Sequence, residues 1–267
     1  MDIQWSLVLF TALTGLGGWL FFFVCLNVFT RKTDKGALVG AVASFALLAV
    51  GGLASVTHLS HPDRMLGALQ HPTSGIFTEA VLVGLLAIVI AAFAVMVKRG
   101  IDGGALKAVA AIGMALGVLM SFMAGQSYLM SAIAAWNTEL LPLGYLSTAA
   151  ASGASAYLAL IAVQKADDKA LSFAGLTTLV AGAVSLVAVI AYGAASGAFA
   201  GEGTLLVAAA VCGGALPAAC GAFAWKKVDK ALTWGAVALV VAIAGSVAFR
   251  CAMWVVGAGL YDFFGLI

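Results

Sequence analysis

Four side chains that could carry out chemistry, Glu79, Arg250, His58 and Tyr128, lie within or at the ends of strongly apolar stretches. The chain is 64% hydrophobic and only 9% charged, so an ionised group in such a stretch stands out. Ionisable residues inside a membrane are costly and mark functional sites by default. A carboxylate or an imidazole can accept protons, and a guanidinium can hold a carboxylate ionised or polarise an oxygen. The set suits proton-coupled chemistry in a pocket next to the membrane.

The apolar stretches that carry these residues are long enough to cross a bilayer. Mean hydropathy is +1.13, and each stretch approaches or exceeds the ~20 residues that a helix needs to span the hydrocarbon. The predicted spans are residues 5–30, 37–58, 75–97, 105–128, 140–164, 170–192, 204–225 and 231–261. We therefore predict an all-α polytopic membrane protein in which eight transmembrane helices form a single domain over residues 1–267.

Basic residues predict the orientation of the bundle. Eleven of the thirteen Lys and Arg residues fall in the alternate connections, which are those between spans 1 and 2, 3 and 4, 5 and 6, and 7 and 8. By the positive-inside rule these connections are cytoplasmic, so both termini should lie on the outer side. The two exceptions, Arg64 and Arg250, should lie toward the outer side and are expected to have specific tasks.

Counting from the inner basic residues gives the depth of each candidate. The separations are 19 residues from Lys98 to Glu79, 20 from Lys230 to Arg250, 21 from Lys107 to Tyr128 and 23 from Lys35 to His58. At about 1.5 Å per residue, these separations place all four side chains roughly 28 to 35 Å from the inner basic residues, at the outer edge of the hydrocarbon. Because Glu79 and Arg250 have opposite charges at one depth, we predict that they are energetically coupled, with Arg64 as the alternative partner. Snorkelling to the interface is the competing interpretation, and it fits Tyr128 best.

Histidine and cysteine positions argue against bound metals. All three histidines lie in the linker between spans 2 and 3; His61 and His71 precede prolines, and their spacing matches no closed zinc pattern. A transmembrane haem needs axial ligands at membrane depth, and only His58 borders a span, so no haem is expected. The cysteines show no C-x-x-C spacing, so neither an iron–sulfur cluster nor a disulfide framework is indicated. These cysteines are Cys25, Cys212, Cys220 and Cys251.

Quinol oxidation fits the remaining constellation. It needs a pocket open to lipid, hydrogen-bonding groups for the ring oxygens, and a titratable group that takes protons. Glu79 and His58 are the candidate catalytic groups, and Arg64, Tyr128 and Arg250 join them as candidate quinol-binding residues. A transporter would need a path to the inner face, and no ionisable residue lies at mid-depth. A retinal protein would need a lysine within the last span, and that span offers only Lys230, at its inner end.

The linker before Glu79 also resembles a known family. Residues 54–64, Ala-Ser-Val-Thr-His-Leu-Ser-His-Pro-Asp-Arg, are similar to the A-S-x-x-H-L-x-x-P-x-R segment of membrane anchor subunits of the dimethyl sulfoxide reductase type, in which a Glu heads the next span. Tyr128, residues 142–145, Thr148 and the pair Phe249-Arg250 match the family more loosely. His58 and Glu79 correspond to the family's quinol-site His and Glu, although the spacing between them is about one residue shorter here.

The resemblance implies a function in anaerobic respiration at the cytoplasmic membrane of a bacterium. Such an anchor oxidises menaquinol at the outer face and passes electrons to an iron–sulfur subunit and then to a molybdopterin catalytic subunit. The protein would carry the quinol site, with menaquinol and menaquinone as bound substrate and product, and would not itself reduce the terminal acceptor. No nucleic-acid partner is expected. Anchors of the polysulfide reductase type, which also react with quinones, are the closest alternative.

Overall fold

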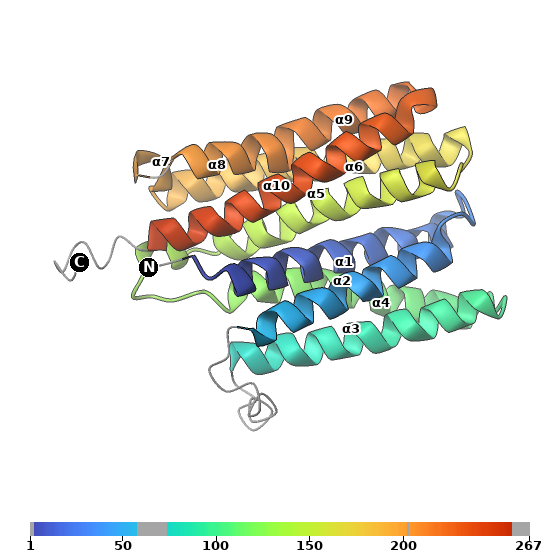
Figure 1. The fold of residues 1–267 in the computed structure, drawn as a ribbon, viewed down its shortest axis with the longest axis horizontal. Coiled ribbons are helices and arrows are strands. Elements are labelled where there is room, and N and C mark those ends of the chain that lie inside the picture. Colours follow the sequence, from blue (N-terminus) through green and yellow to red (C-terminus); the bar gives the residue numbers. More distant parts are fainter. Residues whose placement is uncertain (1–2, 58–73, 202, 258–267) are drawn as a thin grey trace.

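The computed structural model describes residues 3–57, 74–201 and 203–257, and these residues form an all-helical bundle (Figure 1). Within these residues, eight helical segments are long and apolar enough to cross a membrane, as predicted. The elements are α1 (Trp5–Thr30), α2 (Ala37–Val56), α3 (Gly75–Lys98), α4 (Gly104–Gln126), α5 (Leu140–Val163), α6 (Asp168–Ala195), α7 (Ala198–Gly201), α8 (Gly203–Ala210), α9 (Leu216–Lys226) and α10 (Ala231–Gly257). One of the eight segments contains both α8 and α9. The predicted fold class is therefore confirmed.

Two groups of helices make up the bundle. In the first group α1 packs on α2 and α4, and α3 packs on α2 and α4. In the second group α6 packs on α5 and α9, and α10 packs on α5, α8 and α9. Helices α1 and α4 both pack on α5 and so join the groups, which form the lower and upper layers of Figure 1. A side chain at the contact of α1, α5 and α10 therefore touches both groups of helices.

Close backbone approach at glycines brings α1 against its neighbours. A Cβ on Gly117 of α4 would lie 2.6 Å from the carbonyl oxygen of Gly18 on α1. A Cβ on Gly15 would lie 3.0 Å from the Ala149 Cβ on α5. Small residues at these crossings let helices pack by van der Waals contact, which is the main attraction between helices in lipid.

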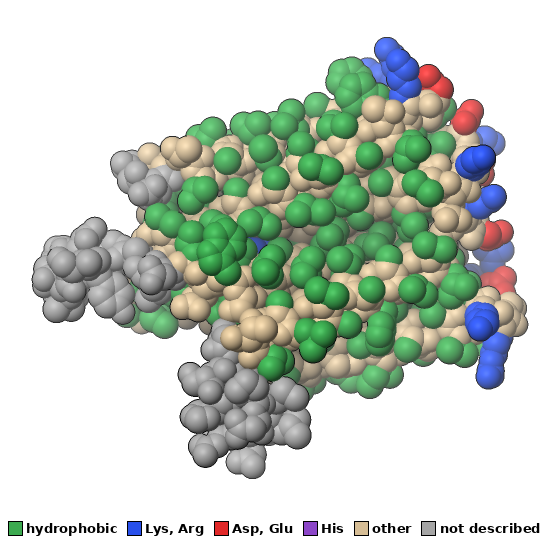
Figure 2. All heavy atoms as spheres, in the orientation of Figure 1, with side chains coloured by type: hydrophobic (Ala, Val, Ile, Leu, Met, Phe, Trp, Pro, Cys, Tyr) green, Lys and Arg blue, Asp and Glu red, His purple; other side chains and the backbone are tan. Residues whose placement is uncertain are grey.

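Charged side chains gather at one end of the bundle (Figure 2). This end contains the connections that carry Arg31 and Lys32, Lys98 and Arg99, Lys165, and Lys226 and Lys227. The beginning of α1 and the end of α10 lie at the opposite end (Figure 1). We call that opposite end, where α3 and α5 begin and α4 ends, the acid end, because Glu79 lies there.

Polar side chains define where two of the spans begin. Ser74 precedes α3, and its hydroxyl accepts a hydrogen bond of 3.1 Å from the Phe77 amide. Asp167 precedes α6 and accepts one of 2.9 Å from the Ala170 amide. Each side chain satisfies one of the amide groups that a helix leaves unpaired at its start.

The seventh span differs from the continuous helix expected for residues 204–225. It consists of α8, a π-helical turn at Val211–Ala215 and α9. Pro217 is the physical reason, because it has no amide to donate to the carbonyl four residues back and its ring crowds that carbonyl. A π turn is a common way to absorb such a break inside a helix.

Candidate functional site

Arg250 of α10 is completely buried, with 0% of its surface exposed. Its Nε donates to Thr11 Oγ1 at 2.9 Å, and its Nη2 donates to the Thr11 carbonyl oxygen at 3.1 Å. Its Nη1 lies 2.6 Å from Ser246 Oγ, 2.9 Å from the Ser246 carbonyl oxygen and 3.4 Å from Thr148 Oγ1. The guanidinium thus joins α1, α5 and α10 through hydroxyl and carbonyl oxygens.

Tyr145 of α5 lies beneath this guanidinium. Arg250 Cζ is 4.6 Å from the centre of the Tyr145 ring, within the range of a cation–π interaction. The same ring is stacked on Tyr128, with centroids 5.7 Å apart and planes inclined by 27°. Phe249, the neighbour of Arg250 on α10, meets Tyr145 edge-on at 5.8 Å. Tyr145 therefore contacts both α10 and the connection that follows α4.

Glu79 lies on α3, one turn beyond the start of the helix, and is partly buried. Ser127, directly after α4, donates its hydroxyl proton to Glu79 Oε1 across 2.6 Å. A Cβ on Gly75, four residues before Glu79, would lie 2.8 Å from Ser127 Cβ, so the bare backbone there lets α3 approach Ser127 closely. A short hydrogen bond to a carboxylate of this kind is charge-assisted and comparatively strong.

Arg250 and Glu79, which we predict to be coupled, do not form a direct ion pair among the described residues. Within the described part of the chain the guanidinium is hydrogen-bonded to α1, α5 and α10, whereas the carboxylate is hydrogen-bonded to Ser127. Helix α3 packs on α2 and α4, while α10 packs on α5 and α9. Counting residues along a helix gives axial depth only, and the two charges share a depth but belong to different helix groups.

Tyr128 links the two charges indirectly. It directly follows Ser127, which binds Glu79, and its ring is stacked on Tyr145, which contacts Arg250. It was predicted at the end of the fourth span, but α4 ends at Gln126, and Tyr128 lies in the connection that follows. Burial raises the pKa of the Tyr128 phenol, the Glu79 carboxylate raises it further, and the Arg250 guanidinium lowers it. Both charges therefore act on one phenol, although they do not touch each other.

An aromatic cluster closes the acid end around Tyr128. The Trp136 and Trp254 rings meet Tyr128 edge-on, with centroids 6.0 and 5.7 Å away. Trp136 also donates its indole N–H to the Met253 carbonyl oxygen at 2.9 Å. Tyr192 donates its hydroxyl to the Ala135 carbonyl oxygen at 3.2 Å. These bonds hold the connection between α4 and α5 against α6 and α10.

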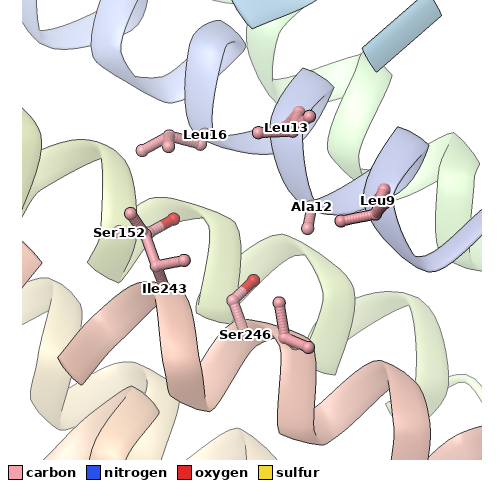
Figure 3. A pocket seen from close by; sticks show the side chains of 8 residues that line it. Leu9, Ala12, Leu13, Leu16, Ser152, Ile243 and Ser246 are labelled. Carbon is pink, nitrogen blue, oxygen red and sulfur yellow. The ribbon is translucent and has the colours of Figure 1, made fainter. Parts of the chain in front are cut away.

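A small apolar pocket lies between α1, α5 and α10 (Figure 3). Its volume is about 60 Å³, well below the ~150 Å³ of a protein cavity that binds benzene. Ser246, whose hydroxyl accepts from Arg250, is one of its lining residues. The pocket is too small for an aromatic ring, so it does not receive the ring of a quinol.

Two of the predicted site residues, His58 and Arg64, lie outside the described residues, as do His61 and His71. Of the others, Tyr128 lies in the connection after α4, and Glu79 is hydrogen-bonded to Ser127 of the same connection. Arg250 is linked to Tyr128 through Tyr145. No group of three or more His, Cys, Asp or Glu that could hold a metal occurs within the ranges described.

Sequence reasoning missed four hydrogen-bond partners of the two charges: Ser127, Thr11, Thr148 and Ser246. The Ser246 contact had a usable signal, because residues four apart lie on one helix face. Thr11 had none, since it comes from the far end of the sequence. Ser127 adjoins Tyr128 and had only the counted depth of its neighbour as a signal.

We expect the purified protein to show no haem b absorbance. Haem b in a membrane protein requires axial ligands at membrane depth, and the spans provide no histidine pair. A reduced-minus-oxidised visible spectrum tests this prediction. A haem band in that spectrum would contradict the ligand argument.

Comparison with known proteins identifies the family to which the chain belongs. The family model described as the DMSO reductase anchor subunit (DmsC) matches residues 1–197, which contain Glu79, Ser127, Tyr128 and Tyr145. The C subunit of the anaerobic dimethyl sulfoxide reductase of Haemophilus influenzae is 30% identical over 193 residues, covering 69% of this protein and 67% of that subunit. The resemblance noted in the linker is therefore confirmed, and the chain belongs to the family of DMSO reductase anchor subunits.

Proposed function

We propose that this anchor subunit oxidises menaquinol at its acid end. The observation that carries the proposal is the Glu79 carboxylate, which lies within a span and is hydrogen-bonded to Ser127, the residue directly before the half-buried Tyr128. A carboxylate at a lipid-facing boundary can take a proton from a quinol hydroxyl as electrons leave. The aromatic ring of Tyr128, the residue after Ser127, suits contact with a flat ring.

The proposed reaction is a two-electron oxidation. Menaquinol loses two protons and two electrons and leaves as menaquinone. Glu79 accepts one proton and passes it to water at the outer face, and His58 is the proposed acceptor for the other. Arg64 and Tyr128 are proposed to contact the ring oxygens. Arg250 was predicted for the same quinol-binding set, but it is fully buried beside Tyr145.

The electrons need acceptors on other subunits. Membership of the anchor family supports partners in a dimethyl sulfoxide reductase complex. We propose that an iron–sulfur subunit docks at the acid end and passes the electrons to a molybdopterin catalytic subunit. By the positive-inside rule we propose that the end of the bundle that carries the clustered Lys and Arg residues lies in the cytoplasm. The acid end and both termini would then face outward across a bacterial cytoplasmic membrane.

Reconstitution with and without this subunit tests the proposal. Membranes that contain all three subunits should reduce the terminal acceptor with a naphthoquinol as donor, and they should also do so with a reduced viologen dye that bypasses the quinol site. Omission of this subunit should abolish the quinol-driven reaction and leave the dye-driven reaction of the other two. Quinol-driven reduction that persists without it would contradict the proposal.

A further inference from the structure

Arg250 has no surface to offer a quinol. It is 0% exposed, and its guanidinium is hydrogen-bonded to Thr11, Thr148 and Ser246. No carboxylate pairs with it among the described residues. A buried charge without an ionic partner is costly, and neutral side chains could join the same three helices. The charge therefore calls for a role beyond cross-linking.

Two consecutive residues of α10 hold the Tyr145 ring. Arg250 lies 4.6 Å from its centre, and Phe249 meets it edge-on at 5.8 Å. Tyr145 is itself 1% exposed, and the backbone of α5 fixes its position. A cation–π contact is strongest where water is excluded, as it is here. The ring of Tyr145 is thus held by two residues of α10 as well as by its own helix.

Tyr128, by contrast, depends on its neighbours for its position. It lies outside any helix, is only half-buried, and follows directly after Ser127, whose hydroxyl binds Glu79. Among the described residues, its one stacked contact is with Tyr145, while Trp136 and Trp254 meet it edge-on. A shift of Tyr145 would therefore move Tyr128 relative to the carboxylate.

We infer that Arg250 and Tyr145 are positioning residues that act on the quinol site through the stacked ring of Tyr128. The guanidinium holds Tyr145, Tyr145 holds Tyr128, and Tyr128 presents its ring directly after Ser127, whose hydroxyl binds Glu79. This inference rests on the proposed quinol oxidation at the acid end. It assigns Arg250 to the site without direct contact with the substrate.

Quinol kinetics of the whole complex in membranes test the inference. Tyr145→Leu, which removes the ring, and Arg250→Met, which removes the cation, should each raise the quinol KM about tenfold, a factor that corresponds to roughly 1.4 kcal/mol. The kcat should change less than about twofold, because the Glu79 carboxylate and its Ser127 partner stay in place. Tyr145→Phe keeps the stacked ring and should restore a KM close to that of the unaltered protein.

A double variant and a matched pair on α1 sharpen the test. If one contact path is shared, Arg250→Met combined with Tyr145→Leu should raise the KM no further than the larger single change. Thr11→Val removes an acceptor of Arg250 and should raise the KM about threefold, roughly 0.65 kcal/mol by the same conversion. Thr14→Val, one turn along the helix, removes only a hydrogen bond to the Phe10 carbonyl and should leave the KM unchanged.

The outcomes separate this inference from the function on which it rests. Dye-driven activity and the amount of assembled complex report folding. An unchanged quinol KM in Arg250→Met and Tyr145→Leu would overturn the positioning role. So would a double variant whose increase in KM equals the product of the two single increases. If Glu79→Gln abolishes quinol turnover in the same membranes, only the inference fails; if Glu79→Gln is also fully active, the proposed function fails with it.

Discussion

Replacement of Glu79 by glutamine is expected to lower quinol-driven turnover by about 100-fold or more, the usual contribution of a general base. Glutamine keeps the volume and can still accept a hydrogen bond from Ser127, so the local packing of α3 against α4 should persist. What it cannot do is accept a proton from the quinol. Quinol-driven turnover should therefore fall while the amount of assembled complex and its dye-driven activity stay normal.

Glu139 offers the matched control for this variant. It lies at the same end of the bundle, directly before α5, and is exposed to the surroundings. Glu139→Gln removes the same charge from the same face and should leave quinol-driven turnover within about twofold, because an exposed surface charge of this kind has little energetic effect. Normal quinol turnover in Glu79→Gln would assign this carboxylate a structural role only.

Replacement of Arg250 by alanine should cause the second large effect, a fall of about 3 kcal/mol or more in the free energy of unfolding. The guanidinium links α1 and α5 to α10, so its removal breaks hydrogen bonds in both helix groups and leaves an empty volume beside Tyr145. Thermal unfolding of the detergent-purified complex measures the loss. Arg250→Met should cost less than Arg250→Ala, since an apolar side chain of similar length fills the volume and removes the cost of a buried charge.

A double-mutant cycle distinguishes the observed geometry from a direct ion pair. A contact between Arg250 and Glu79 would make the combined loss in Arg250→Ala with Glu79→Ala smaller than the sum of the two single losses. The structure separates the two groups by Tyr128 and Tyr145, so we expect the stability losses to add within about 0.5 kcal/mol. Coupling well above that value would show that the two charges meet, contrary to the contacts described.

The amino-acid sequence was sufficient for the number, order and approximate limits of the spans. Hydrophobic length decides whether a segment crosses the bilayer, and every backbone group of a spanning helix is paired within that helix, so this property is local. The segregation of basic residues into alternate connections was equally visible, and it matches the charged end of the bundle in Figure 2. The limits of α1 were predicted to the residue.

Other local features had partial signals. Pro217 was visible in the seventh span, but whether it kinks, ends or locally rewinds the helix depends on packing. In the structure the helix forms a π turn at Val211–Ala215, where Gly213 lies against Gly245 of α10. Similarly, α4 ends at Gln126, before Tyr128, whose ring is stacked on Tyr145, and residue counting did not include that contact.

The partners of the charges were decided by tertiary structure alone. A single sequence gives the depth of Glu79 and Arg250 along their helices, but it does not say which helices are neighbours or how each is rotated. Those properties come from close packing of small residues, such as Gly18 on Gly117 and Gly15 on Ala149, summed over the whole bundle. The packing places α10 against α1 and α5 and leaves α3 beside α4. Consequently the cation is bound by Thr11, Thr148 and Ser246, and the carboxylate by Ser127, with two tyrosine rings between them.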